Sequence, residues 1–104
     1  MSDAGLSLSI CPGGDTLNLV LAGEIDLASA PRLQSCLEDI GLEWTRVRLD
    51  FARVTFLDSS GIAVLIRAHQ RCRDAGQILE VRNTLAPVRR ALEMTGVPAL
   101  FLVD

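Results

Sequence analysis

Apolar and polar residues alternate along the first part of the chain, and a period of two is typical of half-buried strands. The alternation covers residues 6–10 and returns at residues 17–23. The Pro-Gly-Gly-Asp segment between them, residues 12–15, has the composition of a turn. These features predict two strands that pair as an antiparallel hairpin, the second ending at Gly23.

From residue 30 onward the apolar spacing changes to three and four residues, which indicates amphipathic helices separated by further strands. Helices are expected at residues 30–40, 62–72 and 85–95, and strands at residues 47–51, 78–82 and 100–103. Gly41, Gly76 and Gly96 follow the three helices and can end them. Thr84 is placed to cap the third helix.

The predicted order of elements is therefore ββαβαβαβ. Strands that alternate with helices imply right-handed crossovers and parallel pairing. The fold class that follows is α/β: one mixed, mostly parallel sheet with an N-terminal hairpin and with helices packed on it. A length of 104 residues fits a single domain spanning residues 1–104.

Composition narrows the possible partners and locations. The chain is 49% hydrophobic and 22% charged, which suits a folded core. Its formal net charge is −3 and no basic block occurs, so the electrostatic attraction that nucleic-acid binding needs is missing. Apolar runs are too short for a membrane span, and the N-terminus lacks a signal-peptide pattern. We expect a cytoplasmic domain with neither nucleic acid nor membrane as a partner.

Enzyme and metal chemistry find little support among the residue types. His69 is the single histidine, and it follows Ser59 by ten residues along one predicted helix. That spacing corresponds to about 15 Å, beyond hydrogen-bond reach. His69 and Cys72 have ligand spacing but no second pair to complete a metal site, and His69 lies on the apolar stripe of its helix. Phosphate-binding glycine motifs are absent, so no enzyme, metal or cofactor is predicted.

The segment at residues 56–62 stands out because it places an acid, two hydroxyls and a glycine at the start of the second helix. Ordinary capping by Asp58 or Ser59 would account for it. Helical geometry also directs both serines toward the polar side, Ser59 near Ala63 and Ser60 near Arg67. A helix N-terminus tolerates negative charge, so a phosphoserine here would add about −1.5 to −2 charge units without opposing the fold.

Four short segments in order then resemble a known family. They are residues 23–26 (GEID), residues 49–51 (LDF) with the apolar positions in 54–57, residues 58–61 (DSSG) and residues 94–96 (MTG). Together they span most of the chain and resemble a STAS domain of the anti-sigma factor antagonist type. One departure is Ala63, where the family commonly has a second glycine; the added methyl could change how a partner fits.

The resemblance implies a partner-switching role. In that family the unphosphorylated protein binds an ATP-dependent serine kinase that also acts as an anti-sigma factor, and this binding releases the sigma factor. The kinase phosphorylates the serine that corresponds to Ser59, the complex separates, and a PP2C-type phosphatase restores the hydroxyl. The residues expected in the partner-binding surface are Asp26, Asp58, Ser60, Gly61, Ala63 and Arg67.

Other functions remain open at this point, because one fold can serve several assemblies. The chain could be an adaptor or scaffold subunit of a stressosome-like particle or of a lipid-transport ATPase complex. A sensor that binds a free anion at the helix start near Ser59 is a further alternative. In both cases phosphorylation of Ser59 would not control binding.

Overall fold

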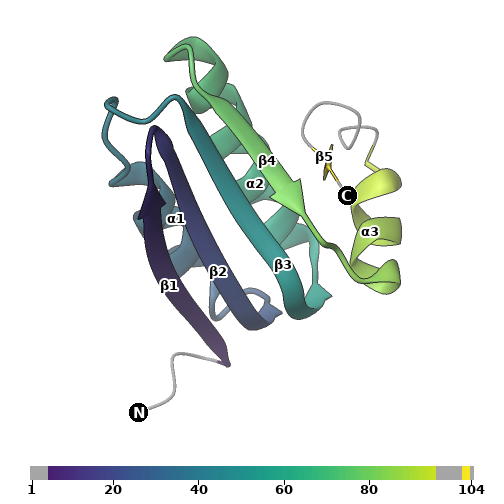
Figure 1. Ribbon diagram of the computed structural model, residues 1–104. Helices are drawn as coiled ribbons and strands as arrows, with labels where there is room; N and C mark the ends of the chain where they lie inside the picture. The colour runs from purple at the N-terminus through teal and green to yellow at the C-terminus, as the bar shows by residue number, and fades with distance from the viewer. Residues whose placement is uncertain (1–4, 96–101, 104) are drawn as a thin grey trace.

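The computed structural model describes residues 5–95 and 102–103, which form five strands and three helices (Figure 1). In chain order they are β1 Leu6–Gly13, β2 Thr16–Ile25, α1 Ala30–Glu38, β3 Arg46–Leu57, α2 Ser59–Asp74, β4 Ile78–Arg82, α3 Ala86–Glu93 and β5 Leu102–Val103. This confirms the predicted ββαβαβαβ order. The expected helix stop Gly96 and the first part of the last predicted strand lie outside the described residues.

The strands form one mixed sheet in the order β1-β2-β3-β4-β5. β1 and β2 are antiparallel, and all later neighbours are parallel. Each crossover moves one strand further in the same direction, so right-handed connections place successive helices on one face. Figure 1 shows α1 and α2 together behind the sheet, with the other face of β1–β4 toward the viewer.

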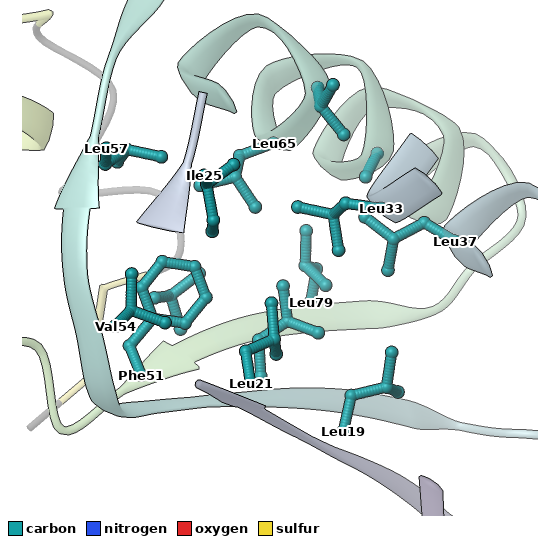
Figure 2. Close-up of a cluster of buried hydrophobic side chains, with 14 of the residues drawn as sticks. Leu19, Leu21, Ile25, Leu33, Leu37, Phe51, Val54, Leu57, Leu65 and Leu79 are labelled. Carbon is teal, nitrogen blue, oxygen red and sulfur yellow. The ribbon is translucent and has the colours of Figure 1, made fainter. Parts of the chain in front are cut away.

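The core lies between the sheet and these two helices. Leu19 and Leu21 of β2 and Phe51 of β3 are completely buried. Figure 2 shows these side chains directed toward α1 and α2, where Leu33 and Leu65 meet them. Alternate positions of the strands therefore supply one apolar face, and the helices cover it. Truncating a fully buried leucine of this kind to alanine costs about 2–5 kcal/mol.

β2 and β3 are longer than the sequence pattern predicts. β2 continues past Gly23 to Ile25, although the alternation suggested that the chain leaves the sheet at Gly23. Gly23 adopts a φ of +112°, and a Cβ there would lie 1.8 Å from the carbonyl oxygen of Gly5. Only glycine permits this close approach. The pairing with β3 shifts register at this point and then resumes, which the simple period of two does not reveal.

Two predicted boundaries are wrong. β1 runs through Pro12 to Gly13, so the turn is shorter than the Pro-Gly-Gly-Asp segment. Proline is tolerated there because β1 is an edge strand. Thr84 does not cap α3: the N-cap residue is Leu85, without a side-chain cap bond, and the Thr84 hydroxyl is buried without a hydrogen-bond partner in the described part of the chain. His69 lies at the boundary of the core, half-buried, as its apolar stripe predicts.

Candidate functional site

The candidate site lies where β2 and β3 end side by side. Ile25 and Leu57 are paired in the parallel ladder, and the next residues are Asp26 and Asp58. The backbone N–H of Asp58 donates to the carbonyl of Ile25 at 3.2 Å, which joins the two strand ends. The sheet therefore brings two acidic residues from distant parts of the sequence into neighbouring loops.

Asp58 is the N-cap of α2. Its backbone is extended (φ −108°, ψ −173°), and its Oδ1 accepts hydrogen bonds from the N–H groups of Ser60 at 2.9 Å and Gly61 at 3.3 Å. These bonds satisfy two of the otherwise unpaired amides at the helix start, an arrangement worth about 1 kcal/mol. Of the two capping candidates, the structure selects Asp58. Its carboxylate also occupies amides that a free anion would need.

Ser59 is the first residue of α2 and is exposed to solvent. Among the residues that the structure describes, no hydrogen bond engages its hydroxyl. Ser60, one position later, is half-buried. The two serines that the sequence could not separate therefore differ, and the more accessible hydroxyl belongs to Ser59.

Gly61 lies in the core beneath this surface. A Cβ at this position would be 2.5 Å from Cδ1 of Leu57 and 2.6 Å from Cγ2 of Ile25. Glycine is needed here because the first turn of α2 packs directly on the ends of β2 and β3. Because Gly61 is buried, it does not form part of the exposed surface; what it contributes there is the close seating of Asp58, Ser59 and Ser60 on the sheet.

Asp26 organises the loop between β2 and α1. Its Oδ1 accepts from the N–H groups of Ala28 at 3.0 Å and Ser29 at 3.1 Å. The hydroxyl of Ser29 donates to the carbonyl of Glu24 at 2.8 Å and accepts from the N–H of Asp26 at 3.0 Å. Ser29 is only 1% exposed. The sequence did not single out Ser29; the available signal was Asp26, because an aspartate side chain often bonds the backbone two residues on and so favours a turn.

A groove of about 460 Å³ runs between α1 and α2 and begins at Ser60. Its lining residues are Leu27, Ala30, Pro31, Gln34, Ser35, Ser60, Ala63, Val64 and Arg67. Across it, Nη2 of Arg67 donates to Oε1 of Gln34 at 2.6 Å. The structure thus brings Ser60, Ala63 and Arg67 onto one side of α2. Helical geometry predicts that Ser60 lies near Arg67, whereas it places Ala63 near Ser59.

Two exposed apolar side chains accompany the acidic loops. Leu27 follows Asp26 and is 79% exposed, and Phe56, near the end of β3, is 47% exposed. The sequence alone did not single out either residue as part of a surface. Large apolar side chains that stay exposed beside polar groups are common where a protein meets a partner.

The described residues offer little support for metal binding or for thiol chemistry. Within 5–95 and 102–103, no three His, Cys, Asp or Glu side chains gather as metal ligands would. Burial raises the pKa of the Cys72 thiol, and burial followed by the charge of Asp39 raises the pKa of Cys36. A raised pKa keeps both thiols protonated and poorly nucleophilic. No helix in the described part of the chain is long and apolar enough to cross a membrane.

Comparison with known proteins places this geometry in a family. The family model described as "Mlab, STAS domain" matches residues 12–104. An anti-sigma-B factor antagonist of Listeria monocytogenes is 30% identical over 84 residues, covering 80% of this chain and 74% of that protein. The Bacillus subtilis anti-sigma-B factor antagonist is 24% identical over 92 residues, 88% of this chain and 84% of that protein.

Solved structures agree on the fold. The crystal structure of an anti-sigma factor antagonist from Mycobacterium paratuberculosis superposes with a TM-score of 0.86 at 21% identity. The match covers 99% of this chain and 89% of that chain. With the family model and the Listeria relative, the paired strand ends and the capped serine-bearing helix show that the chain belongs to the STAS-domain family and is a homologue of its anti-sigma factor antagonists.

Proposed function

We propose that this chain is a cytoplasmic anti-sigma factor antagonist that is switched by phosphorylation of Ser59. In its unphosphorylated form it binds an anti-sigma factor that is also an ATP-dependent serine kinase, and the sigma factor is released. The observation that carries the proposal is the exposed Ser59 hydroxyl, which no hydrogen bond in the described residues engages, at the rigidly capped start of α2. The family membership supplies the class of partner.

The chemical cycle needs no catalytic group from this chain. The kinase transfers the γ-phosphoryl group of ATP to Oγ of Ser59; the hydroxyl proton is lost and ADP leaves. A PP2C-type phosphatase then hydrolyses the phosphoserine with water, which restores the hydroxyl and releases phosphate. This chain is the substrate in both steps, and its role is to present the serine.

The fold can accept the modification. Asp58 caps the helix through the amides of Ser60 and Gly61, and the side chain of Ser59 takes no part in that cap. A phosphate on Ser59 therefore breaks none of the hydrogen bonds that hold the loop. Negative charge at a helix N-terminus is also favoured by the helix dipole.

A partner would respond strongly to the same modification. Phosphorylation adds about −1.5 to −2 charge units beside Asp58 and the neighbouring Asp26 loop. Arg67, the basic residue that lines the groove with Ser60, donates a hydrogen bond to Gln34 across the groove. Like-charge repulsion and desolvation at an interface cost several kcal/mol, and each 1.4 kcal/mol is about tenfold in affinity.

The contact surface that we propose surrounds Ser59. It comprises Asp26, Asp58, Ser60, Ala63 and Arg67, with Gly61 acting from below. The exposed side chain of Leu27, which lines the groove with Ser60, Ala63 and Arg67, gives the surface apolar area. The groove between α1 and α2 continues this surface away from Ser60.

The test is a pull-down from lysate of the source cells with ATP present and with bound proteins identified by mass spectrometry. The baits are the wild type, Ser59→Ala, Ser59→Asp and the matched control Ser7→Ala, an exposed serine of β1 outside the proposed contact surface. We expect a serine kinase to be retained by Ser59→Ala and lost with Ser59→Asp, and Ser7→Ala to behave like the wild type. Recovery of the same transporter or scaffold subunits by all four baits would contradict the switch and favour an adaptor.

A further inference from the structure

The outer edge of the sheet at β1 has the properties of a self-pairing surface. Within the described residues, β1 pairs with β2 alone, so its other side presents backbone groups to solvent. Its sequence, LSLSICPG, contains no charged residue, and Ile10 is 57% exposed. Exposed edge strands are normally protected by charges, prolines, bulges or short length. This strand has eight uncharged residues, and its one proline, Pro12, lies next to its last residue.

The pairing with β2 determines which backbone groups point outward. The N–H of Glu24 donates to the carbonyl of Gly5, which marks that pair as hydrogen-bonded. In an antiparallel ladder such pairs alternate with non-hydrogen-bonded ones. The odd-numbered residues of β1 therefore direct their backbone groups toward β2, and Leu6, Leu8, Ile10 and Pro12 direct theirs outward.

At each end of this outward row, one backbone group is not available for pairing with another strand. Nη1 of Arg32, on α1, donates to the carbonyl of Leu6. Pro12 has no N–H to offer. No hydrogen bond within the described residues engages the outward N–H and C=O groups of Leu8 and Ile10, at the centre of the edge.

We propose that β1 pairs antiparallel with β1 of a second copy of this chain, centred on Ser9. In this register Leu8 faces Ile10 of the second copy and Ile10 faces Leu8, so both open residues exchange hydrogen bonds in each direction. Leu6 faces Pro12, whose missing N–H would have served the carbonyl that Arg32 already satisfies. If the pair were centred on Leu8, Ile10 would face Leu6, whose carbonyl already accepts from Arg32. If it were centred on Ile10, Leu8 would face Pro12, which has no N–H to donate.

Side chains and charge favour the same arrangement. Leu8 and Ile10 lie on the helix-covered face, so each exposed Ile10 gains an apolar neighbour from the other copy. Each chain carries a net charge of −3, and an uncharged strand is where two such chains meet with little repulsion. A two-fold axis through Ser9 makes the interface isologous, so the pairing stops at two copies.

Cysteine cross-linking tests the register. In the proposed pair Ser9 faces Ser9, and Ser7 faces Cys11, at non-hydrogen-bonded positions where opposite Cα atoms lie about 4.5 Å apart, within disulfide range. Ser9→Cys in a Cys11→Ser background should form a linked dimer under mild oxidation. Ser7→Cys in the same background should not, because the two introduced thiols would be about 13 Å apart along the strands. Ser7→Cys with Cys11 retained should link again.

Solution mass tests the association itself. The wild type should sediment at about twice the 11.2 kDa chain mass, and Ile10→Lys at the mass of one chain with an unchanged fold by circular dichroism. The Leu8 and Ile10 amides should be protected from hydrogen exchange in the wild type and exposed in the variant. A wild type of single-chain mass, or linking by Ser7→Cys/Cys11→Ser and not by Ser9→Cys/Cys11→Ser, would overturn the proposal. Protection that appears solely with an added partner protein would also overturn it.

Discussion

The loops that follow β2 and β3 begin in the same way and end with different roles. In each, an aspartate follows the paired strand residue and its Oδ1 accepts hydrogen bonds from the second and third amides along: Asp26 from Ala28 and Ser29, and Asp58 from Ser60 and Gly61. In the first loop the serine is buried and hydrogen-bonded. In the second, Ser59 is exposed.

The difference shows that an Asp-Ser pattern does not by itself identify a modification site. The serine three positions after the aspartate turns inward and supports the loop. The serine one position after it stays at the surface, and Gly61 takes the inward position instead. Location along the turn decides between a structural hydroxyl and an accessible one, because in both loops the third position after the aspartate is buried (Ser29, Gly61) and the first is exposed (Leu27, Ser59).

The largest expected effect concerns the inward position of the second loop. Gly61→Ala should lower the free energy of unfolding by about 1–3 kcal/mol, because its methyl overlaps Leu57 and Ile25. Urea denaturation followed by circular dichroism measures this, with Ser60→Ala as the matched control. A loss no larger than that of the control would mean that the strand ends relax to admit the methyl, and the two loops would then be less different than their packing suggests.

The next largest effect concerns Ser29 and Ser59, which should differ in how much each contributes to the free energy of unfolding. Ser29→Ala leaves the part-buried Glu24 carbonyl and Asp26 N–H without their hydroxyl partner, so we expect a loss of about 1–3 kcal/mol. Ser59→Ala should stay within about 0.5 kcal/mol of the wild type, since its side chain is exposed. Equal losses in thermal or urea unfolding would show that Ser59 is also structural and would weaken the case for a switch.

The smallest expected effect separates the hydrogen bonds that the Asp58 side chain accepts from the contribution of its charge. Asp58→Asn keeps an oxygen that can accept from the amides of Ser60 and Gly61, so stability should fall by a few tenths of a kcal/mol. Asp58→Ala removes the cap and should cost about 1 kcal/mol. The affinity of the partner for each variant, measured by calorimetry, would then show how much the carboxylate charge of Asp58 contributes to binding. If Asp58→Asn is as unstable as Asp58→Ala, the charge contributes to the cap.

Much of the fold follows from local patterns. The period of two in β1 and β2, the helical stripes and the glycines between elements predict the observed order, because each of these signals acts within a few residues of itself. Boundaries were less predictable. β2 continues through the register shift beyond Gly23, and Thr84 lies one residue too early to cap α3, since both outcomes depend on what the neighbouring element permits.

The candidate site divides in the same way. The sequence by itself determined that an acid, two serines and a glycine begin the second helix, and its motifs pointed to the family. Only the tertiary structure decided which serine is exposed, that Gly61 is buried against Ile25 and Leu57, and that the side chains of Leu27 and Phe56 stay exposed. The physical reason is that exposure is set by contacts between residues distant in the chain, and parallel strand pairing creates those contacts only once the sheet has formed.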